Sequence, residues 1–178
     1  MSTDRFPAYL RLLRPSGDEA DSAHVSTLGL IRPPRGWERD RLCGVGTRQA
    51  LIERLETLAA LSPNAPLSFA LVKVHGLAET NREDGFQAGD AVLRGVAAKV
   101  IEFTRATDFV GRFTGSSFGV VLQGSGATAA AAVAGRLEHH LRITGPSRTS
   151  IDVSVATGRG INATMLPLAA VDSFTGAG

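Results

Sequence analysis

Arg105 and Asp108, an arginine and an aspartate separated by two residues, are the clearest pair in this sequence with binding chemistry. The arginine guanidinium is planar and presents its N–H donors in a fixed fork, so it can hold a phosphate or a planar acceptor edge through two hydrogen bonds. The same two residues could instead form a salt bridge at a helix end, which would contribute little to stability. The pair alone leaves both interpretations open.

Cys43 and the adjacent residues His139 and His140 are the other side chains whose types suggest reactive or metal-binding chemistry. Cys43 is the only cysteine, so the chain can form no internal disulfide and offers no cysteine-based zinc site. Neighbouring residues of a helix point about 100° apart, which disfavours a metal ion shared by two adjacent histidines. We expect Cys43 to pack as a small apolar residue, both histidines to face solvent, and no metal ion or cofactor to be bound.

The composition is that of an ordinary globular protein, with 178 residues of which 43% are hydrophobic and 20% are charged. The formal net charge of +2 is too small to predict nucleic-acid binding, although a few local arginines could hold a small anionic ligand. No apolar signal core follows Met1, and the apolar runs are too short to span a bilayer. We therefore expect a cytoplasmic protein with no membrane span and no nucleic-acid partner.

Hydrophobic periodicity predicts an α/β sandwich (α+β), in which helices flank a mostly antiparallel central sheet. Helical spacing covers residues 48–61, 90–103 and 127–143, and strand patterns cover residues 67–75, 108–113, 117–122 and 150–156. We treat residues 1–38 as an N-terminal appendage and residues 39–178 as one domain. Residues 5–14 mix arginines with apolar residues in a pattern typical of a short helix. The apolar residues are Phe6, Tyr9, Leu10, Leu12 and Leu13.

Three segments resemble the GGDEF (diguanylate cyclase) family, in the same order and at the same separations. Asp40–Arg48 is similar to the family's opening turn, Asp-x-Leu-Thr-Gly-Leu-x-Asn-Arg. Asn81–Leu93 is similar to its Asn-Asp-x-x-Gly-His-x-x-Gly-Asp-x-Val-Leu stretch, and Arg105–Phe118 is similar to its Arg-x-x-Asp motif followed by the hairpin that names the family. The resemblance covers Asp40 to Asp172 and implies a nucleotide-cyclase-like sheet in a degenerate member of the family.

The residues needed for catalysis are replaced at the matching positions. The resemblance implies that active members hold two Mg²⁺ ions on an Asp at the end of the first strand and an acidic residue of the hairpin. Here Lys73 takes the place of that Asp, His75 the place of the second strand-end acid, and Ser116 and Ser117 the place of the acidic pair. Divalent cations need such ligands to neutralise the triphosphate, so we expect no enzyme activity. Lys73 could simply reach solvent, or its ammonium could take the place of the missing cation beside a phosphate.

Two positions that the family uses to read guanine are retained, at Asn81 and Asp90. An amide and a carboxylate match the acceptor and donor edges of guanine and reject adenine. Asp90 could instead serve as the N-cap of a helix, and Asn81 could cap a loop. We expect at most weak, metal-independent binding of GTP here, because the phosphate half of the pocket is changed.

The resemblance also implies a binding site for cyclic di-GMP. Arg105 precedes the hairpin residue Thr114 by the offset of the family's inhibitory site, with Asp108 in the matching position. Arg136, on the next predicted helix, is similar to an additional arginine that completes this site in some members. We expect a cyclic di-GMP receptor, with the ligand bound as an intercalated pair between two copies of the domain. The alternatives are a ligand-free protein–protein interaction module, in which the fold is a scaffold for a signalling partner, and a GTP sensor without turnover.

The C-terminal part departs from the family pattern after Ala156. The usual closing helix, with its basic residues, is replaced by Gly158–Asn162 and a short stretch at Thr164–Asp172. We expect either that the fold is trimmed at this point or that another segment, such as the N-terminal appendage, fills the space.

Overall fold

A four-stranded antiparallel sheet with helices on both faces forms the framework of the domain, in a computed structural model that describes residues 39–144 and 149–175. The strands are β1 (Pro66–His75), β2 (Phe109–Thr114), β3 (Ser117–Gln123) and β4 (Ser150–Arg159), in the order β2-β3-β1-β4. The predicted α/β architecture is confirmed. The predicted appendage at residues 1–38 lies outside the described residues.

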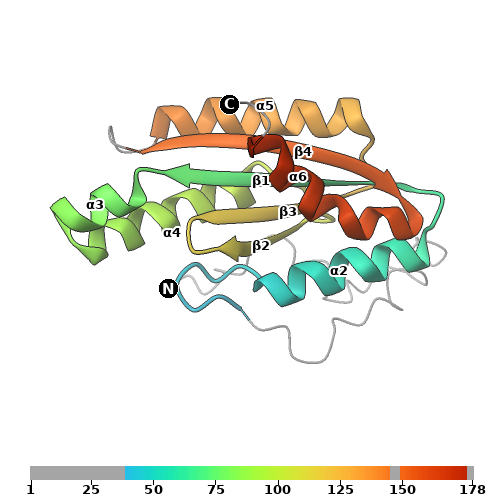
Figure 1. Ribbon diagram of the computed structural model, residues 1–178, viewed down its shortest axis with the longest axis horizontal. Coiled ribbons are helices and arrows are strands. Elements are labelled where there is room, and N and C mark those ends of the chain that lie inside the picture. Colours follow the sequence, from blue (N-terminus) through green and yellow to red (C-terminus); the bar gives the residue numbers. More distant parts are fainter. Residues whose placement is uncertain (1–38, 145–148, 176–178) are drawn as a thin grey trace, which may run out of the picture.

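Helices cover both faces of this sheet, and Figure 1 shows α6 crossing in front of the strands while α4 lies behind them. They are α2 (Arg48–Leu61), α3 (Leu77–Asp84), α4 (Phe86–Glu102), α5 (Ala127–Thr144) and α6 (Leu166–Thr175), with a 3₁₀ turn η2 (Gly160–Met165) before α6. No helix among the described residues is long and apolar enough to cross a membrane.

Alternation along β1 divides the apolar interior into two cores, because successive side chains of a strand point to opposite faces. Phe69 and Leu71 pack into the core beneath α2 and α6. Ala70 and Val72 pack into the core beneath α4 and α5. The two faces of the domain are therefore covered by different helices, and surfaces on opposite sides are separated by the sheet.

The helical hairpin formed by α3 and α4 differs from the prediction. Gly85 separates the two helices with a φ of 87°, a left-handed conformation that favours glycine, and α4 begins at Phe86 rather than at Asp90. Asp90 therefore lies inside α4, so the alternative interpretation of Asp90 as an N-cap is wrong. α3 could not be predicted from hydrophobic periodicity. Thr80 is its only buried residue, so the helix has no apolar stripe.

The expectation that the closing helix is missing is also wrong. η2 and α6 fold back over β4, where the Ser154 hydroxyl donates to the Ala170 carbonyl at 2.7 Å. Leu166 and Ala170 are buried in the core beneath α2 and α6. Pro167 stands at the second position of α6. In a sequence a proline often indicates a loop, but it is compatible with a first helical turn. The described part of α6 carries no basic residue.

Candidate functional site

The end of β1 and the turn between β2 and β3 form one corner of the domain, and they bring together the positions at which we predict that catalytic residues are replaced. Lys73 lies opposite Ser117 in the antiparallel pairing of β1 with β3. The hydroxyl groups of Ser117 and Thr114 share a hydrogen bond of 2.6 Å. The Ser116 carbonyl accepts a hydrogen bond from the Val74 amide at 2.9 Å, which fixes the turn against the strand.

A cavity of about 200 Å³ opens at this corner beneath α6. The Lys73 ammonium points toward α6, where Nζ lies 5.6 Å from the centre of the Phe174 ring. An aromatic face attracts a cation, so the ring holds the ammonium at the cavity wall. The lining combines one lysine and three hydroxyl side chains with four apolar ones, and comprises Leu71, Lys73, Phe113, Thr114, Ser116, Ser117, Val171 and Phe174.

His75 contacts β4 at the same end of the sheet. Its Nε2 lies 2.9 Å from Oδ2 of Asp152, and the two side chains are 39% and 52% exposed. Asp152 also lies opposite Lys73 in the pairing of β1 with β4. A protonated His75 would form a surface ion pair with Asp152, which contributes little to stability.

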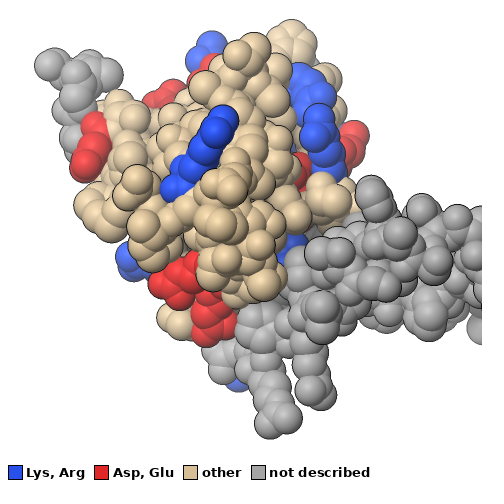
Figure 2. All heavy atoms as spheres, turned by 90° about the vertical axis from the view of Figure 1, so that its right-hand side faces the viewer, with Lys and Arg blue, Asp and Glu red and all other residues tan. Residues whose placement is uncertain are grey.

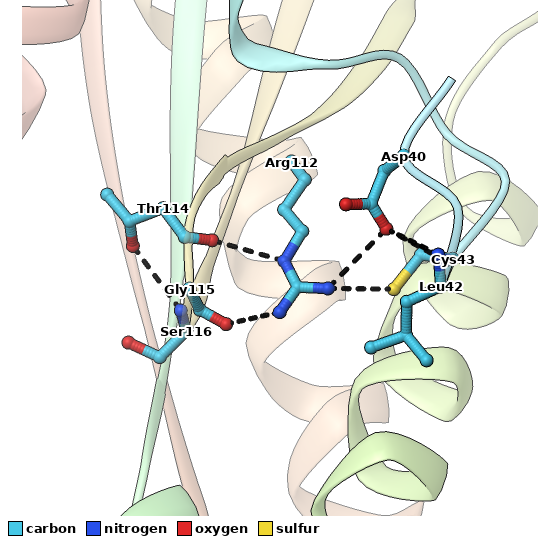
Figure 3. Close-up of polar contacts among 7 residues, drawn as sticks. All are labelled: Asp40, Leu42, Cys43, Arg112, Thr114, Gly115 and Ser116. Carbon is cyan, nitrogen blue, oxygen red and sulfur yellow. Dashed lines mark hydrogen bonds and ion pairs between the residues drawn. The ribbon is translucent and has the colours of Figure 1, made fainter. Parts of the chain in front are cut away.

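Arg112 connects the β2–β3 turn to the loop that precedes α2, a role that the sequence analysis missed. Its guanidinium donates from Nη2 to the Gly115 carbonyl at 2.6 Å and from Nε to the Thr114 carbonyl at 3.3 Å (Figure 3). On its other side, Nη1 lies 3.4 Å from Oδ1 of Asp40 and 3.7 Å from Sγ of Cys43. One planar group therefore joins two segments far apart in the sequence.

Asp40 organises the loop that receives Arg112. Its Oδ1 accepts from the amide of Cys43 at 2.8 Å and from that of Leu42 at 3.2 Å (Figure 3). Burial raises the pKa of the Cys43 thiol to about 11 against the opposing charge of Arg112, and Asp40 adds to the rise. The thiol is therefore protonated at neutral pH, in line with a packed side chain rather than a nucleophile.

Arg105, Asp108 and Arg136 come together at the junction between α4 and β2. The Arg105 side chain is exposed in the turn after α4. Arg136 reaches across from α5, where its Nη2 donates to the Phe103 carbonyl at 3.4 Å. The positive charges of both arginines act on the Asp108 carboxylate, which places all three groups in one neighbourhood. Arg105 and Arg136 stay predicted ligand contacts, now with a shared location, beside the buried Asp108.

Asp108 is 4% exposed and faces the protein rather than solvent. Its Oδ2 accepts from the backbone amide of Arg105 at 2.9 Å, and its own amide donates to the Arg105 carbonyl at 3.0 Å. Burial raises the pKa of this carboxyl, while the amides of Arg105 and Gln123 and the two arginine charges oppose the rise. Within residues 39–144 and 149–175, no hydrogen bond of regular geometry reaches Oδ1. The carboxylate therefore holds the turn that presents Arg105.

His140 stacks on Phe103 beside this junction, with the ring centres 4.0 Å apart and the planes 13° from parallel. The expectation that both histidines face solvent is therefore wrong for His140, while His139 is exposed. His140 lies four residues after Arg136, so both side chains project from the same face of α5 onto the end of α4. This contact fixes α5 against the segment that carries Arg105.

Asn81 lies in α3 and points toward α4. Its Oδ1 is buried against Gly89, where a Cβ atom would collide with it, and accepts no hydrogen bond from the described residues. Asp90 follows Gly89 in α4 and is half-buried. The hairpin of α3 and α4 thus brings the two predicted guanine contacts to neighbouring positions, at the opposite end of α4 from Arg105.

The family profile described as "Diguanylate cyclase, GGDEF domain" matches residues 38–165, which is most of the chain. The chain belongs to the GGDEF family. A curated relative, the diguanylate cyclase DgcP of Pseudomonas aeruginosa, is 35% identical over 85 residues, which is 47% of this chain and 13% of DgcP. The GGDEF chain described here therefore spans only a small part of that relative.

Solved structures of GGDEF proteins have the same fold. The diguanylate cyclase SiaD of Pseudomonas aeruginosa, solved with its activator SiaC, aligns with a TM-score of 0.68 at 22% identity over 87% of this chain and 64% of SiaD. The GGDEF domain of DgcB from Caulobacter crescentus, solved with cyclic di-GMP, aligns with a TM-score of 0.68 at 19% identity over 78% and 91%. A sensory box/GGDEF protein from Caulobacter crescentus aligns with a TM-score of 0.67 at 26% identity over 79% and 99%.

The magnesium ions that the family implies do not fit the residues at this corner. The corner offers the Lys73 ammonium and the hydroxyls of Ser116 and Ser117 where carboxylates would be needed. Among the described residues there is no group of three or more His, Cys, Asp or Glu side chains that could hold a metal ion. A cation next to Lys73 would meet charge repulsion rather than neutralisation.

Proposed function

We propose that this GGDEF domain lacks cyclase activity and binds cyclic di-GMP at the junction of α4 and β2, through Arg105 and Arg136 with the support of Asp108. The observation that carries the proposal is the convergence of two guanidinium groups beside one buried carboxylate. The GGDEF domain of DgcB was solved with the same ligand, and another solved GGDEF domain is described by its interaction mode with cyclic di-GMP.

The chemistry of the ligand suits these residues. Cyclic di-GMP offers two phosphates and the acceptor edges of two guanines, and a guanidinium can bind either group with two parallel hydrogen bonds. Hydrogen bonds to charged groups contribute roughly 1.5–3 kcal/mol each, so a few of them support micromolar affinity. Arg105 is exposed and Arg136 comes from a second helix, so the ligand would be held between two elements.

Loss of catalysis is supported by the corner that contains Lys73, where the residues needed to hold divalent cations are absent from the matching positions. Metal-free GTP binding at Asn81 and Asp90 is the weaker alternative, since base contacts without a phosphate site give little affinity. A ligand-free protein-interaction module is the remaining alternative.

Isothermal titration calorimetry of the full chain with cyclic di-GMP tests the proposal. We expect binding in the micromolar range, lost in Arg105→Ala and weakened in Arg136→Ala. Arg94→Ala is the matched control, because Arg94 is an exposed arginine on α4 outside the junction. Asn81→Ala should also bind normally. If the wild-type chain releases no heat at high micromolar ligand, the receptor proposal is wrong and the protein-interaction alternative replaces it.

A further inference from the structure

The two lysines of the chain, Lys73 and Lys99, differ in their partners. Lys99 forms an ion pair on α4, where its Nζ lies 2.9 Å from Oε2 of Glu102. Lys73 is half-buried, and within residues 39–144 and 149–175 its ammonium makes no hydrogen bond or ion pair and contacts only the Phe174 ring. Burial removes part of the hydration of a charge, and an aromatic ring offsets only a fraction of that loss. The ammonium is therefore suited to an anionic partner.

Asp152 is the carboxylate that lies opposite Lys73 in the pairing of β1 with β4. Its Oδ2 instead contacts Nε2 of His75 at 2.9 Å, and the Asp152 side chain is 52% exposed. Asp152 is also absent from the residues that line the cavity beneath α6. The Lys73 ammonium therefore faces the cavity, while the Asp152 carboxylate is directed at His75.

Hydroxyl groups line the same cavity on the side of the β2–β3 turn. The Ser116 hydroxyl makes no hydrogen bond to any described residue. Thr114 and Ser117 share one hydrogen bond of 2.6 Å, which uses one of their two hydroxyl protons and leaves the other available. Figure 3 shows the Thr114 and Ser116 side chains on the side of the turn away from the Arg112 guanidinium. The described lining therefore offers an ammonium and two available hydroxyl donors, with no carboxylate among them.

We propose that this cavity binds one tetrahedral oxyanion without a metal ion, either inorganic phosphate or the phosphate group of a small monoester. Lys73 supplies the charge, and the hydroxyls of the turn donate hydrogen bonds to the phosphate oxygens. A volume of about 200 Å³ holds one such group with a few waters, since one water occupies about 30 Å³. Sites that enclose drug-sized ligands have about 300–1,000 Å³, so neither a nucleoside nor cyclic di-GMP fits inside.

The oxyanion site is separate from the ligand contacts considered above. No residue of α3 or α4 lines the cavity, so Asn81 and Asp90 do not share it, and Arg105 and Arg136 lie outside it at the α4–β2 junction. Figure 2 shows the opposite end of the domain, where β1 begins, and the basic side chains there are spread over separate places with acidic ones among them. Attraction of an anion to that end would be diffuse, whereas the proposed binding is confined to one cavity.

NMR titration of the ¹⁵N-labelled full chain with inorganic phosphate tests the proposal, with EDTA present and chloride used to keep the ionic strength constant. We expect saturable shifts of the amides of Lys73, Ser116 and Ser117. Lys73→Gln should weaken binding at least about tenfold, because it removes a charged hydrogen-bond donor. Lys99→Gln is the matched control and should bind as the wild type does. Asp152→Asn removes a negative charge beside the cavity and should tighten binding at low ionic strength.

Glycerol phosphate distinguishes the two sources of the anion. Equal affinity for glycerol phosphate and inorganic phosphate would place the ester group outside the cavity, and a preference for inorganic phosphate would identify the free ion, so either result supports the site. Shifts no larger than those caused by chloride, or shifts that persist unchanged in Lys73→Gln, would overturn the proposal.

The Asp152→Asn variant gives an independent test if Lys73→Gln alters the fold, which the amide spectrum would reveal. Weaker or unchanged phosphate binding in Asp152→Asn would contradict an ammonium-anchored site beside this carboxylate. The affinity for cyclic di-GMP should be the same in the wild type and in Lys73→Gln, because Lys73 is not part of the α4–β2 junction. Failure of the oxyanion site would therefore leave the receptor proposal untouched, and the reverse also holds.

Discussion

Lys73 lies directly opposite Ser117 in the antiparallel pairing of β1 with β3, so an ammonium and a hydroxyl meet at the corner where we propose that magnesium binding is lost. We expect incubation with GTP and either Mg²⁺ or Mn²⁺ to yield no cyclic di-GMP above a blank, because transition-state charge has no metal to neutralise it. Chromatography of the reaction mixture, with an active diguanylate cyclase run in parallel, makes the measurement. Sustained, protein-dependent turnover would show that the metal ligands lie elsewhere.

The same corner offers a gain-of-binding control. Replacing Lys73 with Asp, Ser116 with Glu and Ser117 with Glu places three carboxylates around the cavity beneath α6. We expect Mn²⁺ binding by calorimetry in this triple variant and none in the wild-type chain, since hard cations need oxygen ligands of opposite charge. Binding of equal strength in both proteins would show that the wild-type corner does accept a divalent cation.

Arg112 should contribute more to the free energy of unfolding than an exposed arginine does. Its side chain is only 17% exposed and joins Asp40 to the carbonyls of Thr114 and Gly115. Arg112→Lys keeps the charge but loses the planar fork, and we expect the free energy of unfolding to fall by about 1–3 kcal/mol. Urea denaturation measures the change. Arg94→Lys, at an exposed position of α4, should leave the midpoint unchanged; equal midpoints in both variants would contradict the role of Arg112.

Cys43 should be a slow target for alkylation in the folded chain. Its pKa is raised from 9.0 to about 11, so at pH 8 the reactive thiolate is about 100-fold rarer than in an unprotected cysteine. We expect iodoacetamide to label the native chain at least that much more slowly than the urea-unfolded chain, as followed by mass spectrometry. Similar labelling rates in the two states would mean that the thiol is neither buried nor held protonated.

The sheet and its main helices could be predicted because their apolar residues recur at strand or helix spacing, as in β1 and α2. Short elements could not. α3 buries one residue, and α6 has a proline at its second position, so neither gives a clear periodic signal. The positions of Lys73, Ser117 and Arg105 were available from sequence motifs. The bridging role of Arg112 was not, because the partners Asp40 and Gly115 are brought to it by the packing of distant segments.

Asp108 should make stability depend on pH. Burial raises its folded-state pKa above the ordinary value of 3.8, so the folded chain holds this proton to a higher pH than the unfolded chain. Its contribution is then most favourable below pH 4 and declines as pH rises through the folded pKa. Asp108→Asn has no such proton and can still accept from the Arg105 amide. We expect the stability of Asp108→Asn, relative to wild type, to improve between pH 4 and pH 7 in urea titrations; a constant difference would contradict the raised pKa.

Arg105→Lys gives the most selective test of ligand recognition. Lysine keeps the positive charge at the α4–β2 junction, so general attraction for an anion survives, but the bidentate planar contact is lost. We expect the affinity for cyclic di-GMP to fall about tenfold or more in calorimetry, close to the effect of Arg105→Ala, because one charged hydrogen bond contributes roughly 1.5–3 kcal/mol. Asp108→Ala should weaken binding less, through the displaced turn that presents Arg105. Wild-type affinity in Arg105→Lys would mean that charge alone suffices, and that the guanidinium does not read the ligand.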